Sequence, residues 1–333
     1  MEATIKSTHN LSLECFKLLA ACFVVFLHIP FSGVFGQWII CLSRFAVPLF
    51  FAVSGWFSFG ASPEKLKKRF VHILLLEIFG DMLYISWRCL RDYLAGESLY
   101  WCLRYQIPDV QALKMWLFWN VDPFAGHLWY LSATCLCYLV LWAFTRLGRK
   151  DYKPLYVTGF ILLLCGFLMG EFSRFTGFRA DYRICRSGLF TGLPVFFLGL
   201  FLRENREELK TWGIPLALSG VALSVLEWKT LGIHDLYIGA VMTAAGILLA
   251  TSSRPGVPGW LTKAAAGFGS VSTTVYLIHL LLQEIYGHYF QYALEMKLGS
   301  LENSLRPLLI LGVSLLIGFG WNGLQKRIHK TNK

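Results

Sequence analysis

Residues 13–31, LECFKLLAACFVVFLHIPF, decide the fold class, because this apolar stretch contains three ionisable side chains, Glu14, Lys17 and His28. A helix of about 20 apolar residues crosses the roughly 30 Å of hydrocarbon in a bilayer. Exposing a charged group to lipid costs about 3 kcal/mol or more, so such groups face a bundle interior or a water-filled cavity. The stretch therefore predicts a membrane helix whose ionisable side chains face a bundle interior or a water-filled cavity.

Similar apolar runs recur along all 333 residues, of which 56% are hydrophobic and 16% aromatic. This composition and the positive mean hydropathy are typical of membrane proteins and exclude an ordinary soluble domain. Continuous runs favour helices over the alternating strands of a membrane barrel. We predict an all-α polytopic bundle, forming a single integral membrane domain over residues 1–333. About ten transmembrane helices are expected, at residues 11–30, 38–59, 70–91, 127–145, 154–171, 187–202, 213–228, 235–251, 269–290 and 306–324.

The basic residues that give the net charge of +11 lie largely in the connections between these spans. If every span crosses, the basic connections share one side, which the positive-inside rule places in the cytoplasm with both termini. The residues concerned are Lys65, Lys67, Lys68, Arg69, Arg146, Arg149, Lys150, Lys153, Arg203, Arg206, Lys210, Lys326, Arg327, Lys330 and Lys333. We attribute the basic balance to topology and contact with anionic membrane lipids rather than to nucleic acid. The expected location is a bacterial cytoplasmic membrane.

No metal is expected. The nine cysteines show no metal-ligand spacing, and most fall inside predicted spans as small core residues. His28, His127 and His279 are far apart in the sequence, so only the fold could bring them to one metal ion.

The three ionisable residues of the first span share one helix face. At 100° per residue, His28 returns to within about 20° of the direction of Lys17, and Glu14 lies within about 60° of both. The rise from Lys17 to His28 is roughly 16 Å. Lysine suits phosphate as a point charge, and histidine transfers protons near neutral pH. The line favours a polar passage; the alternative is a structural Glu14–Lys17 ion pair with His28 at the outer end.

The order Glu14, Lys17, His28 resembles the first-helix motif of the acyltransferase-3 family of integral membrane acyltransferases, in which Asp, Arg and His usually occupy this spacing. Later blocks that resemble the family are SRFAVPLFFAVSGWF (43–57), GHLWYLSA (126–133), RSGLFTGLPVFFLG (186–199) and VYLIH (275–279). The resemblance covers nearly the whole chain. In character it is closest to the subfamily that includes the membrane domain of vancomycin-resistance serine racemases.

Two departures from the family pattern concern the charged residues. Glu14 and Lys17 keep the sign of the usual charges, but lysine lacks the bidentate fork of arginine. The paired-arginine motif of many relatives is represented after the second span only by Arg69, followed by His72. Lys67 and Lys68 still supply positive charge there.

The resemblance implies transfer of an acyl group, commonly acetyl from acetyl-coenzyme A, to a hydroxyl of an extracytoplasmic acceptor such as a carbohydrate. It assigns the acid/base role to His28 with Glu14 and Lys17 in the catalytic site. Donor binding would fall to Lys17, Lys67, Lys68 and Arg69. We assign Arg44, Arg186, His127 and His279 to acceptor binding; for Arg44 and His127 the alternatives are an interface residue and a structural turn residue.

Two other classes of function are compatible with ionisable groups in a helix bundle. A small-molecule carrier, for example for amino-acid uptake, would use the same polar passage. Such carriers often have corresponding broken helices in two halves, and the sequence shows no repeat of that kind. The third class is a noncatalytic membrane scaffold, which the altered charge motif would fit.

Overall fold

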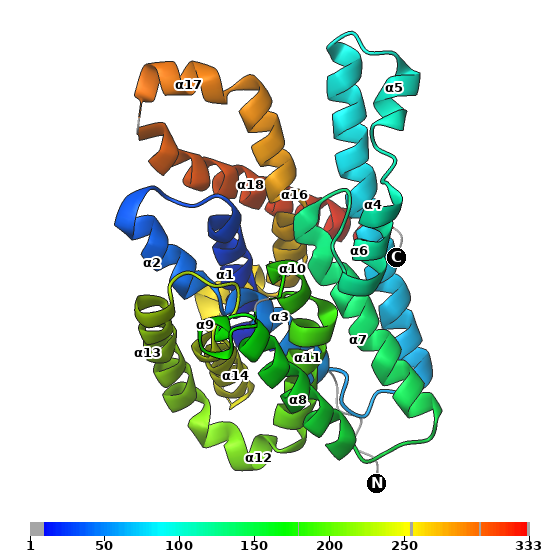
Figure 1. The fold of residues 1–333 in the computed structure, drawn as a ribbon, viewed down its shortest axis with the longest axis vertical. Helices are drawn as coiled ribbons and strands as arrows, with labels where there is room; N and C mark the ends of the chain where they lie inside the picture. The colour runs from blue at the N-terminus through cyan, green and yellow to red at the C-terminus, as the bar shows by residue number, and fades with distance from the viewer. Residues whose placement is uncertain (1–9, 179, 254–255, 300, 332–333) are drawn as a thin grey trace. The chain divides into compact units, whose positions relative to one another are not determined.

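The computed structural model describes residues 10–178, 180–253, 256–299 and 301–331. These residues form helices and connections with no strand among them, which confirms the all-α prediction (Figure 1). The helices are α1 (Leu11–His28), α2 (Gly33–Ser43), α3 (Ala46–Trp56), α4 (Pro63–Leu94), α5 (Leu99–Arg104), α6 (Val110–Trp119), α7 (Trp129–Arg146), α8 (Lys153–Met169), α9 (Ser173–Thr176), α10 (Tyr182–Cys185), α11 (Leu193–Glu204), α12 (Arg206–Leu209), α13 (Gly213–Leu231), α14 (Ile238–Ser253), α15 (Thr262–Ala265), α16 (Phe268–Tyr289), α17 (Gln291–Leu298) and α18 (Leu301–Thr331). Single turns are η1 (Gly126–Leu128), η2 (Gly188–Gly192), η3 (Lys210–Trp212) and η4 (Gly259–Leu261).

Within the described residues, six helical stretches are long and apolar enough to cross a membrane: Leu11–His28, Gly33–Trp56, Pro63–Leu94, Gly126–Arg146, Arg206–Leu231 and Leu301–Ile328. A seventh is present if Gly259–Ala265 and Phe268–Tyr289, bent by 50°, form one span. The apolar helices α8 and α14 are shorter. The chain is therefore an integral membrane protein. All ten predicted ranges overlap helices, but ten crossings stay a prediction.

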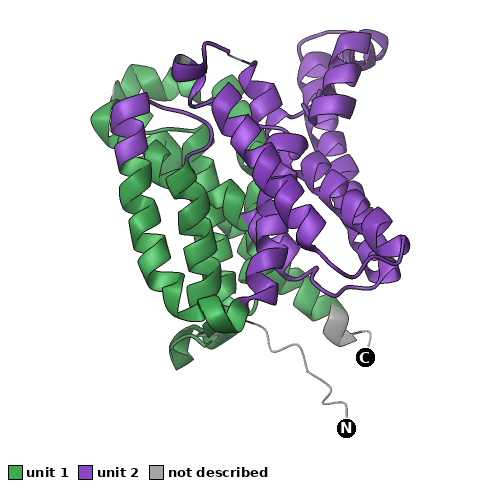
Figure 2. Ribbon diagram, turned by 60° about the horizontal axis from the view of Figure 1, so that its bottom comes forward, with its two compact units in different colours: residues 1–49, 206–225, 238–333 green, residues 50–205, 226–237 purple. Residues whose placement is uncertain are grey.

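The described chain divides into two compact units (Figure 2). Unit 1 comprises residues 1–49, 206–225 and 238–333, and unit 2 comprises residues 50–205 and 226–237. The single integral membrane domain expected over residues 1–333 stays a prediction. Each unit contains predicted site residues, so we describe the units separately.

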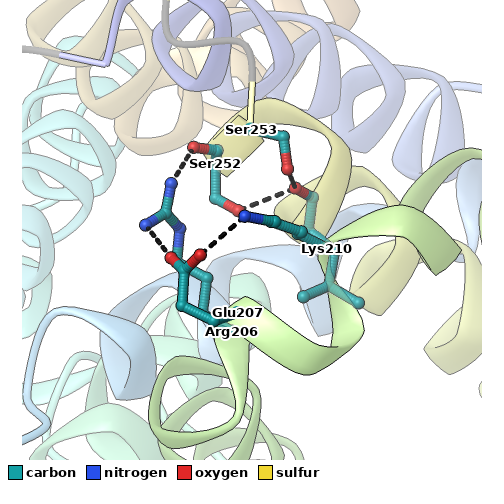
Figure 3. Close-up of polar contacts among 6 residues, drawn as sticks. Arg206, Glu207, Lys210, Ser252 and Ser253 are labelled. Carbon is teal, nitrogen blue, oxygen red and sulfur yellow. Dashed lines mark hydrogen bonds and ion pairs between the residues drawn. The ribbon is translucent and has the colours of Figure 1, made fainter.

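Unit 1 is built around α1, which packs against α2, α14, α15, α16 and α18. Small residues bring other backbones together in this unit. A methyl group added at Gly220 of α13 would lie 2.5 Å from the backbone nitrogen of Thr243 in α14. Such close helix contacts through small residues are typical of membrane bundles. At the end of α14, Arg206 donates to the carbonyl of Ser252, and Glu207 pairs with both Arg206 and Lys210 (Figure 3).

Unit 2 pairs α4 with α7 and α8 with α11. Local signals set the helix boundaries: Ser62 caps α4 by accepting from the backbone nitrogen of Lys65, and Pro63 starts that helix. At the end of α6, Asn120 adopts a left-handed conformation with φ 57°. Its side-chain oxygen accepts a hydrogen bond of 3.0 Å from the backbone nitrogen of Gly188. This contact ties the segment before α7 to the start of η2.

Candidate functional site

The sequence around α1 fixes where its ionisable line begins and ends. Asn10 caps the helix, since its side chain accepts from the backbone nitrogen of Leu13 at 3.0 Å. At the other end Pro30 disfavours helical geometry for the preceding Ile29. The helix therefore ends at His28, which leaves this side chain exposed at a helix terminus.

Glu14 and Lys17 form the ion pair that their spacing allows. The Lys17 ammonium lies 3.1 and 3.2 Å from the two carboxylate oxygens of Glu14. Both side chains are half-buried, with 16% and 24% of their surfaces exposed. A methyl group added at Gly269 of α16 would lie 2.4 Å from Glu14 Oε2 and 3.3 Å from Lys17 Nζ. The pair therefore lies directly against the first turn of α16.

At the other end of α1, His28 faces the middle of α16. The centroids of the His28 and His279 rings are 5.4 Å apart, with the ring planes inclined by 39°. His279 is fully buried in α16, and its Nδ1 lies 3.1 and 2.9 Å from the carbonyl oxygens of Val275 and Tyr276. Because carbonyls only accept, Nδ1 carries the proton, and Nε2 of a neutral His279 is an acceptor.

These contacts place α1 and α16 side by side and parallel within unit 1. The rise from Gly269 to His279 is about 15 Å and that from Lys17 to His28 about 16 Å, so both contacts fit one pair of helices. The ionisable face of α1 is therefore turned toward α16. The polar passage along this line stays a prediction.

Arg44, the remaining predicted site residue of unit 1, follows the C-terminus of α2. Its backbone nitrogen donates to the carbonyl of Cys41, and its side chain is half-buried.

In unit 2, His127 and Arg186 are both found at the N-terminal end of α7. His127 lies buried in η1, where its Nε2 is 3.4 Å from the hydroxyl of Tyr84. The guanidinium of Arg186 lies 5.5 Å from the ring centroid of Trp129, the first residue of α7, and 5.3 Å from that of Tyr182. Two sequence blocks separated by about sixty residues thus meet at one helix end.

A group of buried acids near this helix end was not among the predicted site residues. Glu77 and Asp81 lie one turn apart on α4, and Asp122 lies in the loop before η1. Glu77 accepts a short hydrogen bond from the Ser132 hydroxyl and one of 3.2 Å from the Trp116 indole nitrogen. The signal was present in the sequence, because two acids four residues apart in an apolar span share one helix face.

The third acid of this group is held by the backbone. Asp122 Oδ1 accepts from the backbone nitrogens of Phe124 and Ala125 at 2.8 and 2.7 Å. Burial raises the pKa of the Asp122 carboxyl, against the effect of these hydrogen bonds.

The residues predicted for donor binding in unit 2 lie at the start of α4. Lys67 and Lys68 are exposed. Arg69 Nη1 donates to the carbonyl of Phe57 and to the hydroxyl of Ser58, both at 2.8 Å. The described parts of the chain contain no group of three His, Cys, Asp or Glu residues that could hold a metal ion.

The range matched by the family comparison includes the sites of both units. The acyltransferase-3 family model, described as an acyltransferase domain, matches residues 10–321. The matched range begins before Glu14 and extends past His279. Neither the curated proteins nor the solved structures gave a significant match. Since the family match covers nearly the whole chain, this membrane protein belongs to the acyltransferase-3 family.

Proposed function

We propose that the protein transfers an acyl group, most simply acetyl from acetyl-coenzyme A, to a hydroxyl of an extracytoplasmic acceptor such as a carbohydrate. The observation that carries this proposal is the pair of imidazoles, His28 and His279, 5.4 Å apart where the ionisable line of α1 ends. A histidine with a neighbouring histidine is suited to proton transfer near neutral pH.

In the proposed reaction His28 is the acid/base residue. A neutral His28 nitrogen takes the proton of the acceptor hydroxyl while the oxygen attacks the thioester carbonyl. Collapse of the tetrahedral intermediate breaks the carbon–sulfur bond, and the imidazolium returns its proton to the departing coenzyme A thiolate. The products are an O-acyl ester and free coenzyme A. No covalent acyl-enzyme is required.

His279 is proposed as a positioning residue rather than a second base. Two backbone carbonyls orient its ring, so its acceptor nitrogen has a defined place in the core of unit 1. An imidazole fixed in this way is suited to holding a neighbouring imidazole, or the hydroxyl that this neighbour deprotonates.

Donor binding is proposed separately for the two units. In unit 1, Lys17 supplies a positive charge that Glu14 orients at 3.1 Å. In unit 2, Lys67, Lys68 and Arg69 supply positive charge at the start of α4. Phosphate groups of coenzyme A are the natural partners of such residues. With the positive-inside rule, the basic connections and both termini are assigned to the cytoplasm of a bacterial cell.

Acceptor binding is proposed for the predicted residues found away from the basic connections. Arg44 belongs to unit 1, whereas His127 and Arg186 meet at the N-terminal end of α7 in unit 2. Arg186 lies over two aromatic rings, and aromatic rings beside polar groups suit a carbohydrate ligand. Membrane lipids are the expected surroundings of both units.

The experiment is release of free coenzyme A from acetyl-coenzyme A by purified full-length protein, with and without added hydroxyl acceptors. We expect His28→Ala to lower the rate by about 10²- to 10⁴-fold, the contribution of a general acid/base group. His288→Ala is the matched control, because His288 is an exposed histidine in the last turn of α16.

A folded His28→Ala protein with the wild-type rate would exclude this mechanism. Transport is tested in parallel by uptake of labelled serine into proteoliposomes. Uptake without coenzyme A release would favour the carrier over the enzyme.

A further inference from the structure

Arg69 of α4 is held in place by the segment that follows α3. Its Nη1 donates 2.8 Å hydrogen bonds to the carbonyl of Phe57 and the hydroxyl of Ser58. These bonds use the two hydrogens of Nη1. No described residue accepts from Nε or Nη2, which leaves the other donors of the guanidinium available.

A second arginine, Arg203, is held by Trp56, the residue directly before Phe57. The guanidinium of Arg203, at the end of α11, lies 5.4 Å from the ring centroid of Trp56, the last residue of α3. Trp56 is buried, whereas Arg203 is exposed and makes no hydrogen bond or ion pair with a described residue. A cation over an aromatic face keeps its N–H edge turned toward other ligands.

Backbone packing within unit 2 holds these two helix ends in register. A methyl group at Gly55 of α3 would lie 1.9 Å from the carbonyl oxygen of Phe196, and one at Gly199 of α11 would lie 2.0 Å from that of Ala52. Only glycine allows this approach at either position. Trp56 directly follows Gly55, and Arg203 lies one turn after Gly199, so the glycine contact fixes the stacked pair.

Other basic residues near this point in the sequence are already neutralised. In unit 1, Arg206 and Lys210 both bond to Glu207, and Arg206 also donates to the carbonyl of Ser252 (Figure 3). Glu204, next to Arg203, accepts instead from the hydroxyl of Tyr156 at 2.6 Å. The neighbouring basic residues thus have acceptors, whereas no residue in the described ranges accepts a hydrogen bond from Arg203.

We propose that Arg203 and Arg69 form a phosphate clamp on the segment Trp56–Ser58. Two guanidinium groups held by three consecutive residues, with unused N–H donors, match the chemistry of a phosphate group, which accepts hydrogen bonds from several cationic donors. The ligand is a phosphate of the acyl-coenzyme A donor or the phosphate of an anionic lipid headgroup. The first source rests on the proposed function, because acyl transfer brings that donor to the protein.

The test measures binding without turnover, by calorimetry of coenzyme A with purified full-length protein. We expect Arg203→Ala to weaken binding about 10- to 100-fold, the range for hydrogen bonds between charged groups. Arg203→Lys should restore only part of the affinity, because lysine lacks the planar fork. Arg149→Ala is the matched control: this exposed arginine in the α7–α8 connection carries the same charge, and its loss should change binding by less than about 3-fold.

Three further measurements identify the phosphate group that is bound, its source and the coupling between the two arginines. Dephospho-coenzyme A, which lacks the ribose 3′-phosphate, shows whether the clamp binds that group. If it does, Arg203→Ala should not weaken the binding of dephospho-coenzyme A. For the lipid, mass spectrometry measures phosphatidylglycerol retained after delipidation, and Arg203→Ala should lower it if the ligand is a headgroup. Combining Arg203→Ala with Arg69→Gln should give less than the sum of the two effects.

The clamp is supported if Arg203→Ala lowers coenzyme A affinity or retained phosphatidylglycerol more than Arg149→Ala does. Unchanged binding of both ligands overturns it. The His28→Ala protein separates the two proposals: it should bind coenzyme A normally, so retained transfer in that variant removes the proposed mechanism without affecting the clamp.

Discussion

Two regions of this protein bury ionisable side chains in different ways. On α1 of unit 1, Glu14 and Lys17 pair with each other and remain half-exposed, and His28 is exposed at the helix end. Between α4 and α7 of unit 2, the acids Glu77 and Asp81 are almost fully buried, with 2% and 7% of their surfaces exposed. The first region keeps its ionisable groups accessible, whereas the second buries its acids and holds Glu77 and Asp122 with protein donors.

This difference helps to distinguish ionisable residues that serve catalysis or binding from those that stabilise a membrane bundle. A group that must exchange protons or bind a ligand has to remain accessible, as His28 does. A buried carboxyl that accepts from a hydroxyl and an indole, as Glu77 does, mainly links helices. We therefore expect changes in the first region to affect transfer and changes in the second to affect stability.

Glu77→Ala should have the largest effect on stability. The substitution leaves the Ser132 hydroxyl without its acceptor and opens a cavity between α4 and α7, so we expect a loss of about 2–4 kcal/mol in unfolding free energy. The check is the unfolding midpoint of the purified protein in detergent.

Two controls make the contrast with the first region sharp. Glu77→Gln keeps a carbonyl acceptor and similar volume, so it should cost much less. Glu14→Ala removes a half-exposed ion pair and should cost at most about 1 kcal/mol. If Glu14→Ala destabilises the protein as much as Glu77→Ala, the division between the regions is wrong.

The sequence predicted the helical fold and the first region because both depend on local signals. Hydrophobic runs of sufficient length predict membrane-spanning helices. Three ionisable residues within one helix can be placed on one face from helix geometry alone. The contact between His28 and His279 depends on α1 lying beside α16, about 250 residues later. The resemblance brought both histidines into the predicted site, but only the structure shows that their rings meet.

The second region and the arginine pair were missed for a physical reason. Asp122 comes close to the acids of α4 from a separate loop, and Arg203 and Arg69 are held by consecutive residues at the end of α3, Trp56 to Ser58. Neither arrangement has a fixed spacing along the chain. The close approach of α3 and α11 depends on two glycines, Gly55 and Gly199, whose role appears only when the helices are packed.

Asp122→Asn should change the pH dependence of stability. Burial raises the pKa of Asp122 above its ordinary value of 3.8, so the folded protein binds this proton more tightly than the unfolded chain. This contribution to stability is complete below 3.8 and is lost as the pH rises through the folded pKa.

Unfolding midpoints measured across mildly acidic to neutral pH test this expectation. The wild type should lose stability with rising pH, by at most about 1.4 kcal/mol per pH unit, relative to Asp122→Asn. Asparagine keeps an oxygen for the backbone nitrogens of Phe124 and Ala125. Parallel curves for the two proteins would show that folding does not raise the pKa of Asp122, which contradicts the expected effect of its burial.

Gly269→Ala should have the smallest effect on stability and a selective effect on transfer. The new methyl group would meet Glu14 Oε2 at 2.4 Å and Lys17 Nζ at 3.3 Å, both at the ends of flexible side chains, so the ion pair has to move. Crowding costs about 1 kcal/mol or more, but alanine gains up to about 1 kcal/mol in helix propensity, so the net stability change is small. We expect the KM for acetyl-coenzyme A to rise about 3- to 10-fold if Lys17 holds the donor.

Gly320→Ala in α18 is the control, because it has the same gain in helix propensity and open space for its methyl group, so its KM should match the wild type. An unchanged KM in Gly269→Ala would leave the ion pair a structural feature and reduce the functional part of the first region to its imidazoles.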